Sequence, residues 1–267
     1  MSLHESAVSL AKLLLKPRRA SVRAIEQPRP LIILGNGPSL NQTMAESADS
    51  LAENPLMAVN FFANTPQFRE LKPEYYVLAD PHFFQNQQDP NVAKLTASLR
   101  AVDWPMTLLV PFGARPDLGG NPNITVEHFP MTAVEGSAAL ERMAYGARLG
   151  MPRPRNVLIP SIMCGAWLGF RDIYIVGADH SWMTSISVNE RNEVVSIQPH
   201  FYKEDDKELE RVRVDYLRHP LHEVVKSFYV AFRSYHQIER WATRKGINIY
   251  NSTPSSFIDA FRRQPLP

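Results

Sequence analysis

The chain has 267 residues, 44% of them hydrophobic, so it is long enough to bury one large core and carry a smaller attached element. A net charge of +2 is too small to indicate general nucleic-acid binding. The single cysteine, Cys164, excludes an internal disulfide framework and suits a reducing compartment. With no apolar run of membrane-spanning length and no recognisable signal peptide, we expect a cytoplasmic protein.

Residues 1–29 form an N-terminal helical and basic segment. Leucines and other apolar residues recur at loosely helical spacing from Leu3 to Leu15, and Lys16, Arg18 and Arg19 follow. Such a helix can rest on an anionic membrane surface, pack on a neighbouring subunit or fray as a tail. Two expectations therefore stay open, peripheral contact with the inner membrane through residues 1–25 and assembly into a homo-oligomer.

Short apolar runs alternate with helical patterns along the rest of the chain. The expected strands are 31–34, 56–59, 75–79, 106–110, 173–176 and 247–250, and the expected helices are 137–150, 160–169 and 222–244. Alternation of this kind predicts an α/β fold, a mostly parallel Rossmann-like sheet with helices on both faces.

Residues 181–220 break this alternation, because the stretch is polar and lacks a clear buried period. An excursion of this length inside a compact domain is usually a lid over a site or a disordered insert. We therefore expect a Rossmann-like nucleotide-binding domain built from residues 30–180 and 221–262, with residues 181–220 as a lid insertion.

The turn after the first expected strand has the residues of a nucleotide-binding turn. Gly35, Asn36, Gly37, Pro38 and Ser39 directly follow four consecutive apolar residues. Glycines let the backbone approach a ligand closely, and the start of the next helix offers N–H groups to a phosphate.

Polar residues also follow the other expected strands. They are Asn60 and Asn64 after the second, Asp80 and His82 after the third, Asp179 and His180 after residues 173–176, and Asn251, Ser252 and Thr253 after the last. Because ligands of open parallel sheets bind outside the carboxyl ends of the strands, we expect these clusters to share one site.

Two kinds of chemistry fit these side chains. Carboxylates and imidazoles suit a divalent ion, with Asp80, Asp179, His82, His180 and His200 as candidate ligands, although no paired-ligand spacing is present. Alternatively, one histidine of the lid region acts as an acid or base, the candidates being His180, His200, His219 and His222. Ser161 and Cys164 lack the elbow motif of a nucleophile.

Patches of residues 30–262 resemble the bacterial lipooligosaccharide sialyltransferases (glycosyltransferase family 42) and the related hydroxymethylpterin pyrophosphokinases. The similarity is carried by the segments 35–40, 59–62, 76–84, 168–179 and 249–254. It implies a single α/β fold with a lid, a CMP-sugar donor, no required metal and often a tetramer.

The same resemblance implies roles for individual residues. Gly35, Asn36, Gly37, Ser39, Asn60 and Asp80 would hold the nucleotide with Ser161 nearby, and His222, or else His219, would be the general base. Two positions depart from the family pattern. Ser181 replaces a tyrosine that stabilises the departing phosphate, a role that Tyr202 can take, and Asp80 replaces an asparagine.

A carboxylate at position 80 repels phosphates unless a cation bridges them, or it accepts protons from ribose hydroxyls instead. The leading prediction is a glycosyltransferase that uses a nucleotide-activated sugar, such as a CMP-sugar, to modify a surface polysaccharide or lipid-linked glycan. His222, His180, Tyr202 and Asp179 are its candidate catalytic residues. The alternatives are a Mg²⁺-dependent pyrophosphokinase holding the ion with Asp80 and Asp179, and a non-catalytic nucleotide-binding protein.

Overall fold

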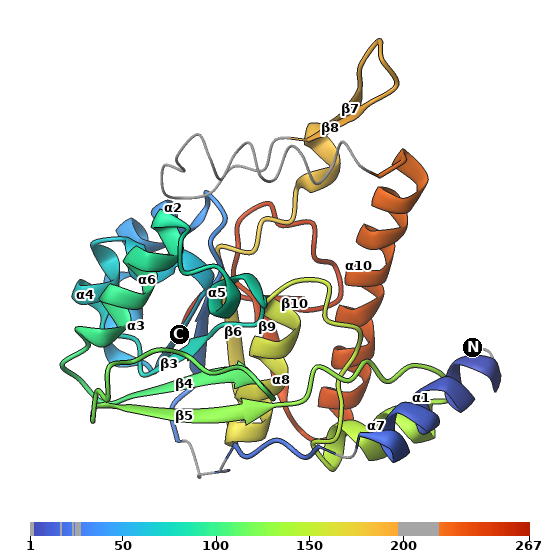
Figure 1. Ribbon diagram of the computed structural model, residues 1–267, viewed down its shortest axis with the longest axis horizontal. Coiled ribbons are helices and arrows are strands. Elements are labelled where there is room, and N and C mark those ends of the chain that lie inside the picture. The colour runs from blue at the N-terminus through green and yellow to red at the C-terminus, as the bar shows by residue number, and fades with distance from the viewer. Residues whose placement is uncertain (1–2, 17, 23, 25–27, 197–218) are drawn as a thin grey trace.

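The computed structural model describes residues 3–16, 18–22, 24, 28–196 and 219–267. Its centre is an eight-stranded sheet in the order β10-β9-β6-β1-β2-β3-β4-β5, and every neighbouring pair is parallel. Helices cover the sheet on both sides (Figure 1). The predicted α/β class is confirmed.

The strands of this sheet are short, and most are buried. They are β1 (Leu31–Leu34), β2 (Leu56–Val59), β3 (Tyr75–Val77), β4 (Met106–Pro111), β5 (Ile124–Phe129), β6 (Asp172–Val176), β9 (Asn248–Asn251) and β10 (Arg262–Arg263). The chain builds outward from β1 to β5 on one side, then crosses to the other side of β1 for β6, β9 and β10. The order therefore reverses beside β1, which is where ligands bind in such sheets.

Two hydrophobic layers sandwich the sheet, because successive side chains of a strand point to opposite faces. In β1, Leu31 and Ile33 join one layer, and Ile32 and Leu34 join the other. The first layer is covered by α1 (Leu3–Leu15), α7 (Ala138–Gly146), α8 (Leu158–Leu168) and α10 (Leu221–Arg244). The second is covered by α2 (Leu40–Glu46), α3 (Ala48–Glu53), α4 (Gln67–Leu71), α5 (His82–Gln85) and α6 (Pro90–Arg100).

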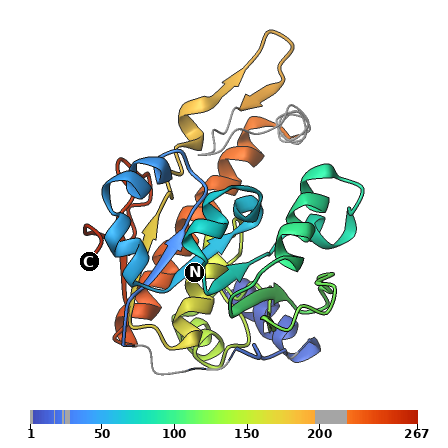
Figure 2. The same cartoon turned by 90° about the vertical axis from the view of Figure 1, so that its left-hand side faces the viewer.

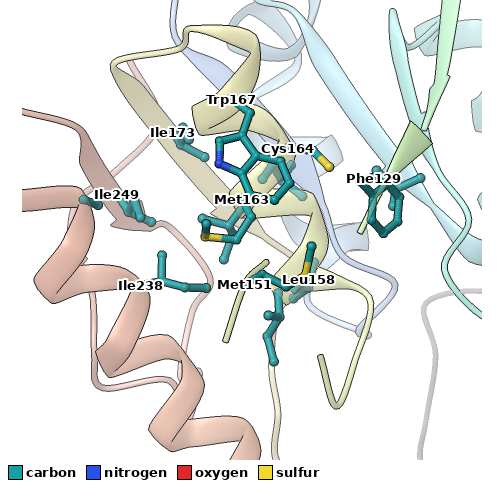
Figure 3. Packing of buried hydrophobic residues seen from close by; sticks show 14 of the residues in the cluster. Phe129, Met151, Leu158, Met163, Cys164, Trp167, Ile173, Ile238 and Ile249 are labelled. Carbon is teal, nitrogen blue, oxygen red and sulfur yellow. The ribbon is translucent and has the colours of Figure 1, made fainter. Parts of the chain in front are cut away.

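Helix α8 is apolar on all sides because it fills the space between the sheet and α10. Met163 and Trp167 of this helix pack among Ile238 of α10 and Ile249 of β9 (Figure 3). Cys164 is fully buried in the same cluster, and burial raises the pKa of its thiol. The cysteine is therefore a packing residue, as its apolar neighbours in the sequence indicate.

Several predicted boundaries shift, and two strands of the central sheet were missed. The third strand ends at Val77, two residues earlier than expected, and the helix expected at 137–150 ends at Gly146. Strand β5 escaped prediction because it lies at the sheet edge, where exposed Thr125 and half-buried Glu127 interrupt any apolar run. Strand β10 was missed because it has only two residues, both arginines.

The described part of the predicted lid projects from the sheet at the end where β6 leaves it (Figures 1 and 2). It consists of the 3-10 helix η2 (Trp182–Ser185) and an antiparallel hairpin of β7 (Ile186–Val188) and β8 (Val194–Ser196). Val194 packs on Val224 and Phe228 of α10, forming a small separate apolar cluster. Residues 182–196 thus have local structure that their polar sequence did not reveal.

Candidate functional site

A cavity of about 680 Å³ lies outside the carboxyl ends of β1, β2, β3 and β6. Its walls come from the turns after these four strands, from the segment that precedes α8, and from the start of the lid. Seven predicted site residues line it, namely Gly35, Asn36, Gly37, Asn60, Asp80, Asp179 and His180. The expectation that distant polar turns meet at one sheet edge therefore holds for four of the five clusters.

The turns after β1 and β6 are bound to each other through their backbones. The N–H of Gly35 donates to the carbonyl of Val176, and that of Gly37 to the carbonyl of Gly177, both at 2.8 Å. A Cβ atom on Gly35 would stand 2.5 Å from the Gly177 oxygen, a distance that real Cβ contacts do not show. Glycine is needed at position 35 because the two backbones touch there.

The carboxylate of Asp179 fastens these two turns further. One of its oxygens accepts the Ser39 hydroxyl proton at 2.7 Å, and the other accepts the Ser39 N–H at 3.3 Å. The phosphate site predicted at the start of α2 is therefore wrong in detail, because the protein itself uses the N–H groups. Ser39 N–H binds Asp179, Gly37 N–H binds Gly177, and Leu40 N–H binds the Gly37 carbonyl.

Asn36 and Asn60 present amide groups on the same wall of the cavity. The Asn36 Nδ2 donates to the Val59 carbonyl at 3.2 Å, and among the described residues its buried Oδ1 has no hydrogen-bond partner. Asn60 adopts a left-handed φ of 51°, which asparagine tolerates better than most residues. The Asn36 oxygen is thus a buried hydrogen-bond acceptor beside the cavity that the described residues leave unused.

Asp80 is exposed in the cavity wall, after β3. Its Oδ1 accepts the backbone N–H of His82 at 2.8 Å, so the carboxylate also stabilises the start of α5. His82 does not turn toward Asp80, because its Nε2 lies 3.1 Å from Asp89. The predicted metal candidate His82 is therefore held by a local hydrogen bond to Asp89.

His180 stands in the cavity wall with most of its ring covered. The ring stacks on Trp182 at 4.1 Å between centroids, and its Nε2 lies 2.6 Å from the Tyr235 hydroxyl. That hydroxyl donates to Asn156 Oδ1 at 3.0 Å, which leaves the His180 Nε2–H to donate to Tyr235. Burial lowers the pKa of His180 to about 3, so the ring is neutral at physiological pH.

Arg155 and Asn156 are cavity residues that the sequence did not single out. Asn156 Oδ1 also accepts the backbone N–H groups of Leu158 and Ile159, and so caps the start of α8. Arg155 is exposed and supplies a positive charge to the cavity wall. The available signal was an arginine and an asparagine just before an apolar helix, a pattern that many helix starts share.

Several predicted site residues lie elsewhere. Ser161 is fully buried within α8 and its hydroxyl donates to the Val157 carbonyl, so it does not reach the cavity. His222 is exposed in the first turn of α10, outside the cavity lining, and exposed His219 pairs with Glu223 at 3.2 Å. Tyr202 and His200 lie outside the described residues.

The last polar cluster is structural. Asn251 and Thr253 are buried and bind the backbone around them, Thr253 by accepting the Ala178 N–H and Asn251 by donating to the Ile258 carbonyl. Asn64 likewise donates to the Asn91 carbonyl, away from the cavity. Thr253 thus braces the turn after β6 that forms part of the site.

Asp80 and Asp179 are the two carboxylates proposed to bind a divalent ion, and their hydrogen bonds show whether they are free to do so. Each oxygen of Asp179 already accepts a hydrogen bond from Ser39, and one oxygen of Asp80 accepts one from His82. Across the described part of the chain, no three histidine, cysteine, aspartate or glutamate residues form a group able to hold a metal ion. These residues do not fit a dedicated Mg²⁺ site.

The fold and site together define a Rossmann-like α/β protein with a ligand cavity at its topological switch point. No protein-family model matches the sequence, and no curated protein matches it. Among solved structures, the fold is similar to that of the MAf glycosyltransferase from Magnetospirillum magneticum AMB-1. The TM-score is 0.51 at 13% identity, over 92% of this chain and 34% of that one. The chain thus spans about a third of the length of this structural neighbour.

Proposed function

We propose that this protein is a glycosyltransferase that transfers a sugar from a nucleotide donor to a hydroxyl group. The observation that carries the proposal is the cavity itself. Side chains that accept hydrogen bonds, the cation of Arg155 and the neutral ring of His180 meet there, where the strand order of the parallel sheet reverses. The fold similarity to a protein described as a glycosyltransferase supports the same class. A CMP-sugar is the donor that the sequence resemblance implies.

The nucleotide would lie along the wall formed by the turns after β1, β2 and β3. Asn36 Oδ1 would accept a hydrogen bond from an N–H group of the nucleobase, and Asn60 would lie beside it. Asp80 would accept hydrogen bonds from the ribose hydroxyls, a role that suits a carboxylate with one oxygen still unused by the backbone. Asp179 would hold the turn in shape without touching the reacting atoms.

In the transfer step, the oxygen of the acceptor hydroxyl forms a bond to the anomeric carbon of the sugar. The bond from that carbon to the phosphate oxygen breaks, and its electron pair leaves with the nucleotide. Arg155 would meet the charge that develops on the phosphate, as preorganised cations do in such sites. Tyr202 is also proposed to stabilise the negative charge on the departing phosphate.

The hydroxyl proton passes to a base, for which His180 and His222 are proposed. His180 lines the cavity and His222 does not, so the geometry favours His180. A phosphate bound nearby would raise the pKa of His180, because a negative charge stabilises the imidazolium. Base catalysis of this kind contributes roughly 10²–10⁴-fold to the rate.

Donor binding is tested by thermal unfolding with CMP, CDP, UDP, GDP and ATP, each with Mg²⁺ or with a chelator. A ligand that binds only the native state raises the midpoint with its concentration. We expect the largest rise with CMP or another nucleotide of a sugar donor, unchanged by the chelator. A rise only with ATP and Mg²⁺ would instead identify the pyrophosphokinase.

Activity is tested by following hydrolysis and transfer of CMP-sugars and UDP-sugars. We expect turnover by the wild-type protein and a loss of at least roughly 100-fold in His180→Gln, since a general base contributes that much. The matched control is His236→Gln, which changes a histidine beside Asp259, outside the cavity lining. A folded protein that turns over no nucleotide sugar contradicts the proposal.

A further inference from the structure

Helix α1 is attached to the rest of the protein through its polar side. The Ser9 hydroxyl donates to the Glu135 carbonyl at 2.8 Å and accepts the Glu135 N–H at 2.9 Å, while Ser6 Oγ accepts the Ser137 N–H at 2.9 Å. The approach is so close that a Cβ on Gly136 would stand 2.3 Å from Ser6 Oγ. Two serines, together with Leu13, therefore face the body of the protein.

Ion pairs and one leucine fix this orientation. Glu5 lies 3.5 Å from Arg233 of α10, and Arg233 also pairs with Glu135, which Arg153 binds from the other side. Leu13 is buried in the main hydrophobic layer. The helix is held at four points along its length, so it cannot rotate its outer side inward without breaking them.

The outer side of α1 is apolar. Leu3 is 90% exposed, Leu14 72% and Leu15 80%, and Leu10 and Val8 are exposed as well. Leu3, Ala7, Leu10 and Leu14 follow the 4-3-4 spacing that places residues on one helical stripe. The normal arrangement of a surface helix, apolar inside and polar outside, is reversed here.

The charges around this apolar face have one sign. Lys12 and Lys16 lie at the end of α1, and Arg18 and Arg19 follow it. The acid of the helix, Glu5, is paired with Arg233 on the inner side. Among the described residues up to position 24 there is no other acid, so the face is cationic as well as apolar.

We infer that the outer face of α1 docks on an anionic lipid surface, with its leucines entering the acyl boundary and its cations at the headgroups. Amphipathic helices with leucines on one side and flanking lysines or arginines bind membranes in this way. Charge complementarity favours lipid over a second copy of the chain, whose matching face carries the same positive charges. No helix in the described ranges is long and apolar enough to cross a membrane, so contact is peripheral.

The surface lies on the side of the molecule away from the hairpin β7–β8 (Figure 1). Docking therefore does not require the cavity, and it can be tested whether or not the protein transfers sugars. The test measures sedimentation of the full chain with vesicles of phosphatidylcholine alone or mixed with phosphatidylglycerol, at low and high salt. We expect binding to the anionic vesicles that weakens as salt rises, because salt screens surface charges.

Two variants separate the apolar and the ionic parts. Leu3→Gln/Leu14→Gln keeps helix propensity and should lower anionic-vesicle binding at least roughly tenfold, since the apolar contact is lost. Lys12→Gln/Lys16→Gln should lower binding to anionic vesicles roughly 25-fold, which is about fivefold for each lost cation. Binding to vesicles of phosphatidylcholine alone should not change. The matched controls are Leu221→Gln/Val225→Gln, exposed apolar positions on α10, and Arg69→Gln/Lys94→Gln, exposed cations elsewhere.

The controls should bind vesicles like the wild type, and all variants should keep its unfolding midpoint. Wild-type protein that does not sediment with anionic vesicles overturns the inference, as does Leu3→Gln/Leu14→Gln bound at the wild-type level. Light scattering provides a third outcome. A wild-type dimer that Leu3→Gln/Leu14→Gln converts to a monomer would show that a second copy covers this face, and would also overturn it.

Discussion

The two halves of the cavity wall use their polar residues differently. The turns after β1 and β6 are hydrogen-bonded to each other, through Gly35, Gly37, Ser39 and Asp179. The turns after β2 and β3 instead present Asn60 and Asp80 at the cavity surface. Apart from Asn36 and His180, which also line the cavity, the first half holds the shape of the site, and the second half would provide groups for a ligand.

Polar residues follow every one of these strands, yet some bind other parts of the protein and others face the cavity. The position of each strand in the sheet explains this difference. The β1 and β6 turns lie next to each other at the point where the strand order reverses, so their polar groups find protein partners. Substitutions in that half should therefore cost stability. Substitutions in the β2 and β3 half should cost ligand binding, with the fold retained.

The largest effect is expected for Gly35→Ala. The added Cβ would meet the Gly177 oxygen at 2.5 Å and its carbon at 2.9 Å, and neither backbone atom can move aside alone. We expect a loss of roughly 3 kcal/mol in the free energy of unfolding, measured by urea denaturation. Gly146→Ala is the control, because its nearest neighbours are 3.7 Å away on the flexible Lys245 side chain. Equal stabilities of the two variants would show that the β1–β6 contact is not tight.

Asp179→Ala should have the next largest effect on stability. It leaves the Ser39 N–H and hydroxyl without their acceptor, and hydrogen bonds to a charged group contribute roughly 1.5–3 kcal/mol. Ser39→Ala removes the hydroxyl alone and should cost about 1 kcal/mol. A double-mutant cycle of the two in urea denaturation should give a coupling energy of at least roughly 0.5 kcal/mol. Additive effects would contradict a structural role for this pair.

The stability of the wild type should fall in acid because of His180. Its pKa is about 3 in the folded state and about 6.5 in the unfolded chain, so above pH 6.5 it has no effect. Below that pH the unfolded chain takes up the proton first, and stability falls by up to about 1.4 kcal/mol per pH unit until pH 3. Between pH 6 and pH 4 this amounts to roughly 2 kcal/mol.

His180→Gln, whose amide can still donate to Tyr235, should remove this part of the pH dependence. The variant and the wild type are compared by urea denaturation at each pH, and their difference in stability should shrink as the pH falls. His236→Gln serves as the control, since that histidine is exposed beside Asp259. An unchanged acid slope in His180→Gln would show that the buried ring is not its source.

Much of this architecture was predictable from local patterns. Four apolar residues before a glycine turn gave β1 and its place in the sheet, because a strand buried on both faces has no polar positions. The same reasoning placed Asn36, Asn60, Asp80 and Asp179 at one edge. Strand β5 was missed for the converse reason, since an edge strand keeps exposed polar residues.

The partners of the site residues were not predictable. Nothing in the order of residues shows that Asp179 binds Ser39, 140 positions away, or that His180 meets Tyr235, 55 positions away. Such pairs depend on how strands and helices are placed, and the sequence specifies that only through the whole core. The resemblance named His222, or else His219, as the base, and neither of them lines the cavity.

The smallest effect on stability, and the most direct test of the ligand-facing half, is expected for Asp80→Asn. The amide oxygen can still accept the His82 N–H, so the free energy of unfolding should change by less than about 0.5 kcal/mol. The lost negative charge should weaken binding of CMP or another donor nucleotide roughly five- to tenfold, because charge-assisted hydrogen bonds to ribose hydroxyls become neutral ones. Isothermal titration calorimetry measures this change.

Whether Asp80→Asn weakens or tightens nucleotide binding shows which part of the nucleotide lies beside residue 80. If Asp80 lay beside the phosphates, neutralising it would remove a repulsion and tighten binding, which would contradict the ribose role. Asp89→Asn is the matched control, because Asp89 also contacts His82 and caps α6 but does not line the cavity. Weaker binding in Asp80→Asn alone, with both variants folded, would establish that the turn after β3 contacts the ligand.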